Sequence, residues 1–201
     1  MSPVRIGLFG GTFDPPHLGH LILAGEAHAQ LCLDRLLWIP SPDPPHKLGQ
    51  VLTPLADRLA MVELAIRGEP AFELSRVELE RPGPHYTLDT VLRIQAEYPS
   101  ADVILLIGGD SLRDLPTWHR AADLLAACRE IGVMRRPGGP DDLTALEAPL
   151  PGIRSKVRFV DAPLLEIASS EIRRRAANGE PFGHYDPPAV REYIQRRGLY
   201  R

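Results

Sequence analysis

Residues 102–109, with the sequence DVILLIGG, constrain the fold of this chain more than any other segment, because five consecutive residues in it are apolar. A strand that is apolar on both faces has to be covered on both faces, and helices supply that cover in parallel sheets. Five other short apolar runs have the length of strands, at residues 4–9, 35–40, 72–79, 130–134 and 157–161.

Segments with helical periodicity separate these runs, at residues 17–33, 54–68, 87–98 and 119–128, and two more follow near 170–178 and 187–198. Strands and helices thus mostly alternate, which predicts an α/β fold: a Rossmann-like, mostly parallel sheet with helices on both faces. Ligands of such sheets bind at the carboxyl ends of the strands. The length of 201 residues indicates a single domain, residues 1–201, with a small helical portion from about residue 168.

Charge and hydropathy exclude several classes of function. The formal net charge of −3 gives no general electrostatic reason to bind nucleic acid or an anionic membrane. No apolar run approaches the roughly eighteen residues that a membrane span needs, and the N-terminus lacks the apolar core of a signal peptide. We therefore expect a cytoplasmic protein without a nucleic acid or a membrane as partner. Cys32 and Cys128 each lie in an apolar, helical-looking segment, which predicts buried, reduced thiols.

The first apolar run is followed by GGTFDPPHLGH, residues 10–20. Gly10 and Gly11 would let the backbone come close to a phosphate, and Thr12 adds a hydroxyl and an N–H. The G-x-G-x-x-G spacing of dinucleotide-binding folds is absent, and so is the Walker spacing. The motif therefore predicts a phosphate site of a third kind.

Two histidines in this motif are three residues apart. Pro15 and Pro16 suit the entry and first position of a helix. His17 and His20 would then lie on one side of its first turn, where free N–H groups and the helix dipole favour a nucleotide's phosphates. A metal pair is the alternative, but zinc needs three or four ligands and no matching set lies nearby, so no protein metal site is predicted. A pair of capping histidines is the other alternative.

Several motifs together resemble a known family. GGTFDPPHLGH resembles the HxGH signature of the nucleotidyltransferase superfamily, and IASSEIR at residues 167–173 resembles its second signature. The segments PPHK, HYTLDT, IGGDSLRDLPTWH and RRPG are similar to parts of the bacterial nicotinate-mononucleotide adenylyltransferases. The resemblance covers nearly the whole chain. It implies a Rossmann-like nucleotidyltransferase fold and transfer of the adenylyl group of ATP to nicotinate mononucleotide, which yields nicotinate adenine dinucleotide and pyrophosphate in NAD biosynthesis.

The resemblance also implies roles on the ATP side. His17, His20 and Arg173 would be catalytic, with His20 at the α-phosphoryl group and Arg173 at the β- and γ-phosphates. The residues expected to bind ATP are Gly10, Gly11, Thr12, Lys47, Gly108, Asp110, Ser169 and Ser170. Lys47 could instead be a solvated loop lysine. Mg²⁺ is expected to arrive with ATP, held by phosphate oxygens and water.

The second signature departs from the family's pattern at one position. Ala168 stands where a serine is usual, so one hydroxyl is missing from the predicted helix end. Arg174 and Arg175 have no counterpart in the signature and are expected to be surface charges.

On the acceptor side, the resemblance assigns Trp118 to stacking on the nicotinate ring, whereas a core position is its ordinary alternative. Thr87 precedes the helix beginning LDTVL and could be its N-cap, close to the nicotinate carboxylate. Arg136 could pair with the acceptor's phosphate, although Arg135 is an equally basic neighbour. A nicotinamide-mononucleotide enzyme, another HxGH-type adenylyltransferase and a non-catalytic nucleotide sensor are the alternatives. The oligomeric state, including a homo-oligomer, is left open.

Overall fold

The computed structural model describes residues 3–43, 51–135, 142–163 and 165–201 of the chain. Within these residues, six strands form one parallel sheet in the order β3-β2-β1-β4-β5-β6. The strands are β1 (Arg5–Gly11), β2 (Arg35–Pro40), β3 (Phe72–Leu74), β4 (Asp102–Gly108), β5 (Glu130–Met134) and β6 (Val157–Val160). The predicted α/β class and parallel sheet are confirmed.

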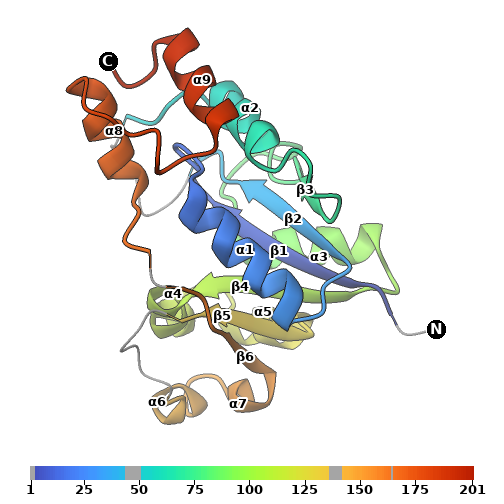
Figure 1. Cartoon of the computed structure of the whole chain (residues 1–201). Coiled ribbons are helices and arrows are strands. Elements are labelled where there is room, and N and C mark those ends of the chain that lie inside the picture. The colour runs from blue at the N-terminus through green and yellow to red at the C-terminus, as the bar shows by residue number, and fades with distance from the viewer. Residues whose placement is uncertain (1–2, 44–50, 136–141, 164) are drawn as a thin grey trace.

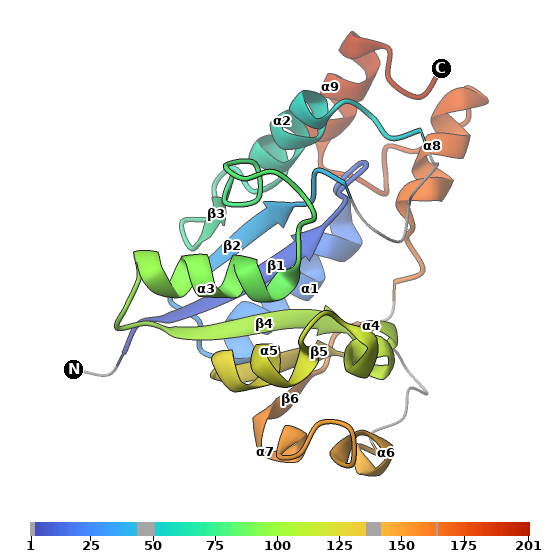
Figure 2. The same ribbon diagram turned by 180° about the vertical axis from the view of Figure 1, so that it is seen from behind.

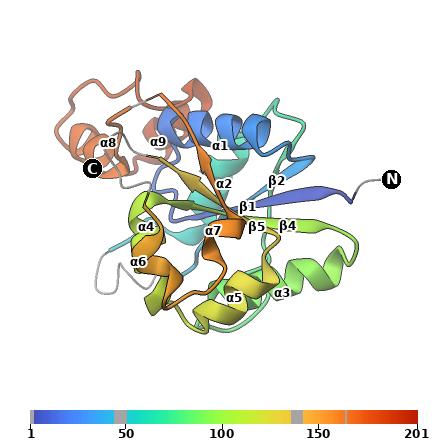
Figure 3. The same ribbon diagram turned by 90° about the horizontal axis from the view of Figure 1, so that it is seen from below.

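Helices cover both faces of the sheet, as Figures 1, 2 and 3 show. Helix α1 lies on one face, and α3 and α5 lie on the other. The helices are α1 (Leu18–Gln30), α2 (Leu55–Ala65), α3 (Thr87–Glu97), α4 (Gly109–Asp114), α5 (Ala121–Ala127), α6 (Thr144–Glu147), α7 (Ile153–Lys156), α8 (Ser169–Ala177) and α9 (Pro188–Arg197), and a 3₁₀ turn, η2 (Leu115–Thr117), follows α4.

Strand β4 explains why both faces are covered. Its consecutive apolar side chains alternate between two cores. Ile104 and Leu106 pack with residues of α1 and α2, whereas Val103, Leu105 and Ile107 pack with residues of α3 and α5. The apolar run therefore has the two-sided burial that the sequence predicted.

The C-terminal helices α8 and α9 build a third, smaller core on α2, at the upper end of the molecule in Figure 1. Its buried members come from α2, α8, α9 and the segment between the last two: Met61, Ala65, Ile172, Phe182, Val190 and Ile194. This core places α8 beside the end of β1. None of the helices within the described residues is long and apolar enough to cross a membrane.

Two local predictions were wrong. The expected strand at residues 72–79 ends at Leu74, because β3 pairs with only three residues of β2 and the chain then leaves the sheet in a turn. The thiol of Cys32 is exposed, because α1 ends at Gln30 and Cys32 takes a left-handed conformation (φ 49°) in the turn toward β2. Cys128 is buried as predicted, and burial raises the pKa of its thiol to about 12.

Candidate active site at the carboxyl ends of the strands

The two glycines of the first motif end strand β1. A Cβ at Gly10 would meet no atom within 4 Å, so the backbone is open to a ligand there. A Cβ at Gly11 would lie 2.8 Å from the ring of Phe13. Gly11 is thus needed for the close approach of this ring, and Gly10 leaves the strand end accessible.

Helix α1 starts later than the prolines predicted. Pro15 and Pro16 precede the helix, whose first residue is Leu18, and His17 is the extended N-cap (φ −144°, ψ 173°). The backbone N–H of Leu18 donates to the carbonyl of Tyr185 at 2.8 Å. A distant segment therefore satisfies an amide that a helix start leaves without an internal acceptor.

The two histidines do lie on one side of the start of α1, as predicted. Their rings are stacked with centroids 3.7 Å apart and an interplanar angle of 30°. The backbone N–H of His17 donates to Nδ1 of His20 at 3.2 Å. Because Nδ1 accepts this hydrogen bond, the ring proton of His20 belongs on Nε2, which makes that atom a donor.

His17 is an uncharged donor or acceptor at neutral pH. Its side chain is only 6% exposed, and burial lowers the pKa of the imidazole to about 4. Its Nδ1 is buried without a hydrogen-bond partner among the described residues. Positive charge for a polyphosphate must therefore come from another residue.

Helix α8 brings that charge from the second motif. Nη1 of Arg173 donates to the backbone carbonyl of Asp14 at 2.7 Å, and Oγ of Ser169 donates to the carbonyl of Pro15 at 2.9 Å. Ser169 and Ser170 are the first two residues of the helix, and Ala168, the N-cap, makes no side-chain capping bond. The two motifs, far apart in the sequence, therefore form one site.

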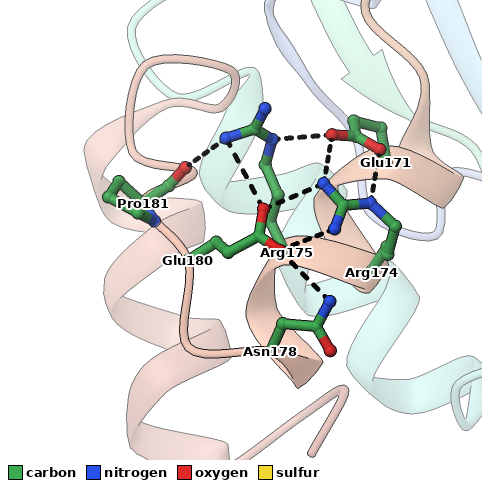
Figure 4. A network of polar contacts seen from close by, with 6 residues as sticks. All are labelled: Glu171, Arg174, Arg175, Asn178, Glu180 and Pro181. Carbon is green, nitrogen blue, oxygen red and sulfur yellow. Dashed lines mark hydrogen bonds and ion pairs between the residues drawn. The ribbon is translucent and has the colours of Figure 1, made fainter.

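Arg174 and Arg175 belong to a separate network on the outer side of α8 (Figure 4). Arg174 pairs with Glu171 at 2.8 Å and with Glu180 at 2.6 Å, and Arg175 pairs with Glu171 at 2.8 Å. Hydrogen bonds from Arg174 lower the pKa of the Glu171 carboxyl to about 2. Arg174 is exposed as predicted, whereas Arg175 is half-buried. Carboxylates balance both of these charges.

A cavity of about 500 Å³ lies at the carboxyl ends of β1, β2 and β4. It brings together residues predicted for ATP and for the acceptor: Gly10, Gly11, Thr12, Thr87, Gly108 and Trp118. Trp118 is half-buried; it packs against the core and also lines the cavity, so its stacking on the nicotinate ring stays a prediction.

Two residues near this cavity differ from expectation. Thr87 is the first residue of α3 and Tyr86 is the N-cap, so the predicted N-cap was one residue too late. Asp110 lies in α4, a short helix that the sequence analysis did not predict, where its exposed carboxylate is 3.2 Å from Arg113. Gly108 is the N-cap of α4.

Sequence reasoning missed a polar cluster in front of α3. The hydroxyl of Thr90 donates to the buried Glu78 at 2.8 Å, and both residues line the cavity. Burial raises the pKa of the Glu78 carboxyl. Arg81 donates to the carbonyls of Pro84 at 2.8 Å and Tyr86 at 3.1 Å. The sequence analysis assigned Glu78 to a strand, whereas in the structure it lies in the turn after β3, which brings its carboxylate to Thr90 of α3.

A second cavity, of about 560 Å³, lies beside the histidines, between α1 on one side and Pro163 and residues 165–168 on the other. His17, His20, Ile167 and Arg135 line it. The guanidinium of Arg135 lies 4.5 Å from the ring centre of Phe159 and 3.4 Å from Asp161. The two imidazoles and the Arg135 side chain therefore border one cavity, together with apolar side chains such as Ile167.

Two predicted site residues, Lys47 and Arg136, lie outside the described residues. Within the described part of the chain, no three His, Cys, Asp or Glu side chains gather as ligands for a metal ion. The donors of the site are imidazoles, a guanidinium and backbone amides, which fit phosphate oxygens better than a bare cation.

Comparisons with known proteins identify the family and the relatives of this chain. The model of the cytidylyltransferase-like family matches residues 8–175. The chain is 48% identical over 197 residues to a probable nicotinate-nucleotide adenylyltransferase of Thermomicrobium roseum, covering 98% of this chain and 92% of that relative. It is 40% identical to the nicotinate-nucleotide adenylyltransferase of Bacillus subtilis, covering 98% of each.

Solved structures show the same fold. The nicotinic acid mononucleotide adenylyltransferase of Plasmodium falciparum, complexed with NaAD, superposes with a TM-score of 0.80 at 19% identity, covering 98% of this chain and 97% of that one. A putative nicotinate-nucleotide adenylyltransferase of Vibrio parahaemolyticus gives a TM-score of 0.68 at 22% identity, covering 98% and 96%.

Proposed function

The chain belongs to the cytidylyltransferase-like family, and we infer that it catalyses the reaction of a nicotinate-nucleotide adenylyltransferase. It transfers the adenylyl group of ATP to nicotinate mononucleotide and releases pyrophosphate, forming nicotinate adenine dinucleotide for NAD biosynthesis. The observation that carries this conclusion is the junction of the two motifs, where Arg173 and Ser169 contact the loop that presents His17 and His20.

The reaction needs alignment and charge neutralisation more than a covalent nucleophile. An oxygen of the acceptor's phosphate forms a bond to the α-phosphorus, and the bond from that phosphorus to the pyrophosphate oxygen breaks. Nε2–H of His20 would donate to the α-phosphoryl oxygens, where charge develops, while Arg173 would hold the β- and γ-phosphates. His17, which is uncharged, would add a hydrogen bond rather than charge.

The amides of Gly10, Gly11 and Thr12 and the N-terminus of α8 would add further donors to the phosphates. Ser169 and Ser170 belong to that helix end. We place Gly108 and Asp110 near the ribose, at the end of β4. Lys47 stays a proposed phosphate ligand on the strength of the PPHK resemblance alone.

The larger part of the acceptor would lie in the cavity lined by Trp118 and Thr87. Stacking of the nicotinate ring on Trp118 is worth roughly 1–3 kcal/mol. The first backbone N–H groups of α3, at Thr87 and the residues after it, lack acceptors within the helix and suit the nicotinate carboxylate. Arg136 is proposed to meet the acceptor's phosphate.

We propose that Mg²⁺ accompanies ATP, held by phosphate oxygens and water, and would offset phosphate charge during transfer. We also propose that the protein acts in the cytoplasm on ATP and nicotinate mononucleotide, without nucleic acid or membrane as partner. The net charge of −3 supports the latter point.

A pyrophosphate-release assay tests the function. Purified protein with ATP and Mg²⁺ should turn over nicotinate mononucleotide faster than nicotinamide mononucleotide, and should not use phosphopantetheine. His20→Ala should lower kcat by roughly a hundredfold or more while ATP still binds. Absence of turnover with nicotinate mononucleotide would refute the function and favour a sensor, and equal rates on the two pyridine nucleotides would refute preference for the acid.

A further inference from the structure

The loop that precedes His17 contains a buried carboxylate, Asp14, that bonds to two other segments of the protein. Asp14 is 1% exposed, and each of its side-chain oxygens accepts a hydrogen bond. The hydroxyl of Tyr200 donates to Oδ1 at 2.7 Å, and the backbone N–H of Thr53 donates to Oδ2 at 3.2 Å. The backbone carbonyl of Asp14 accepts from Arg173. Asp14 thus links the site to the C-terminal segment.

Tyr200 is placed for this contact at a conformational cost. It follows α9 and has a left-handed backbone (φ 65°), which residues other than glycine rarely adopt. Burial and the nearby Asp14 raise the pKa of its hydroxyl well above the usual value, so the phenol stays protonated and donates. Its ring belongs to the small core that α2, α8 and α9 share. The surroundings therefore hold the hydroxyl at Asp14.

A buried arginine supports the same loop from another direction. Arg58 of α2 is 1% exposed and donates to backbone carbonyls of Thr12, Ser41, Pro42 and Thr53 at 2.8–3.2 Å. These bonds join the segments that follow β1 and β2 to α2. The loop is therefore anchored at Thr12 by Arg58 and at Asp14 by Tyr200.

We propose that Tyr200 is a positioning residue for adenylyl transfer: by holding Asp14, its hydroxyl sets the loop on which His17 stands and to which Arg173 is bonded. This inference rests on the proposed function. Tyr200 touches no reacting atom in it. Its contribution is the alignment of the imidazoles and the guanidinium, which belong to segments far apart in the sequence.

The protein contains a matched control for this hydroxyl. The hydroxyl of Tyr193, on α9, donates to the buried Asp57 at 2.8 Å. That bond also joins a tyrosine of the C-terminal segment to a buried carboxylate, but Asp57 lies on α2 and is not part of the first motif. Tyr193→Phe and Tyr200→Phe each remove one hydroxyl and one such bond.

The experiment compares the two variants with the unchanged protein in the pyrophosphate-release assay. Tyr200→Phe should lower kcat by about tenfold or more, because a small displacement of catalytic groups has large effects on rate. Its KM for nicotinate mononucleotide should change little. Trp118 and α3, which are proposed to bind the acceptor, pack in a different core from Tyr200. Tyr193→Phe should leave kcat within about twofold. Equal values of kcat for the two variants would overturn the proposal.

A second measurement separates this inference from the proposed function. The pKa of His17, followed by NMR of its ring protons, should rise from about 4 toward 6.5 in Tyr200→Phe, because a displaced loop exposes the imidazole, and should not move in Tyr193→Phe. If the unchanged protein shows no turnover, the proposed function fails. The titration of His17 then tests by itself whether Tyr200 positions the loop. An unmoved His17 pKa in Tyr200→Phe would then refute the positioning role.

Discussion

At the scale of single residues, His17 and His20 illustrate what spacing can and cannot predict. Their separation of three residues correctly predicts rings on one side of the helix start. It does not predict that His17 is buried, because the residues that cover it come from elsewhere in the chain. The charge of the site therefore depends on Arg173 rather than on two imidazolium groups.

Burial of His17 also predicts a pH dependence of stability. The pKa of His17 is about 4 in the folded protein and 6.5 in the unfolded chain, so between these values only the unfolded chain binds the proton. His17 therefore favours folding fully above pH 6.5, and this contribution of about 3 kcal/mol is lost as the pH falls to 4. Urea unfolding at a series of pH values measures it.

The control for this prediction is His17→Gln. Asp186 acts in the opposite sense, because burial raises the pKa of its carboxyl to about 6 and it takes up a proton in the folded state first. The comparison of the two proteins cancels Asp186 and isolates His17. Between pH 7 and pH 4 the unchanged protein should lose more unfolding free energy than the variant. Parallel curves would contradict the burial of an uncharged imidazole.

At the scale of elements, the N-terminus of α3 depends on a residue that precedes it in a loop. Arg81 donates to the carbonyls of Pro84 and Tyr86, and its guanidinium lies 3.5 Å from the carboxylate of Asp89 in the first turn of α3. These contacts hold the segment that leads into Thr87 against the helix. The helix itself was predictable from its periodicity, whereas these contacts of Arg81, called the Arg81 clamp below, were not.

Loss of the Arg81 clamp should weaken acceptor binding. Arg81→Gln should raise the KM for nicotinate mononucleotide by about tenfold and leave the KM for ATP unchanged, because Arg81 bonds to the segment that leads into Thr87, a residue proposed to bind the acceptor. Arg93→Gln is the control. Arg93 lies on α3, and its guanidinium is 3.5 Å from the carboxylate of the exposed Glu80. Steady-state kinetics with each substrate varied in turn measures both constants. Equal changes in the two KM values would contradict a local role for Arg81.

At the scale of the whole molecule, the C-terminal helices complete the site at the end of β1. The core shared by α2, α8 and α9 positions Arg173, and the carbonyl of Tyr185 accepts from the start of α1. We expect these helices to fold together with the sheet as one domain, in agreement with the single domain proposed from the length of the chain.

Truncation of a buried residue in this core tests that expectation. Ile172 is fully buried on α8, so Ile172→Ala should lower the free energy of unfolding by about 2–4 kcal/mol in a single transition. Leu92→Ala should cost little, because Leu92 is 45% exposed on α3. Calorimetry measures both variants. Two separate transitions for Ile172→Ala would contradict a single domain.

The sequence by itself determined the order of the six strands and of helices α1, α2, α3, α5, α8 and α9, but not the short helices α4, α6 and α7. Periodicity and turn residues act through near neighbours, and β2 and β5 were therefore predicted with the bounds that the structure has. Only the tertiary structure decided that the two motifs meet, that His17 is uncharged, and that Tyr200 reaches Asp14. Burial, pKa values and long-range hydrogen bonds depend on how distant segments pack, and local patterns do not encode that packing.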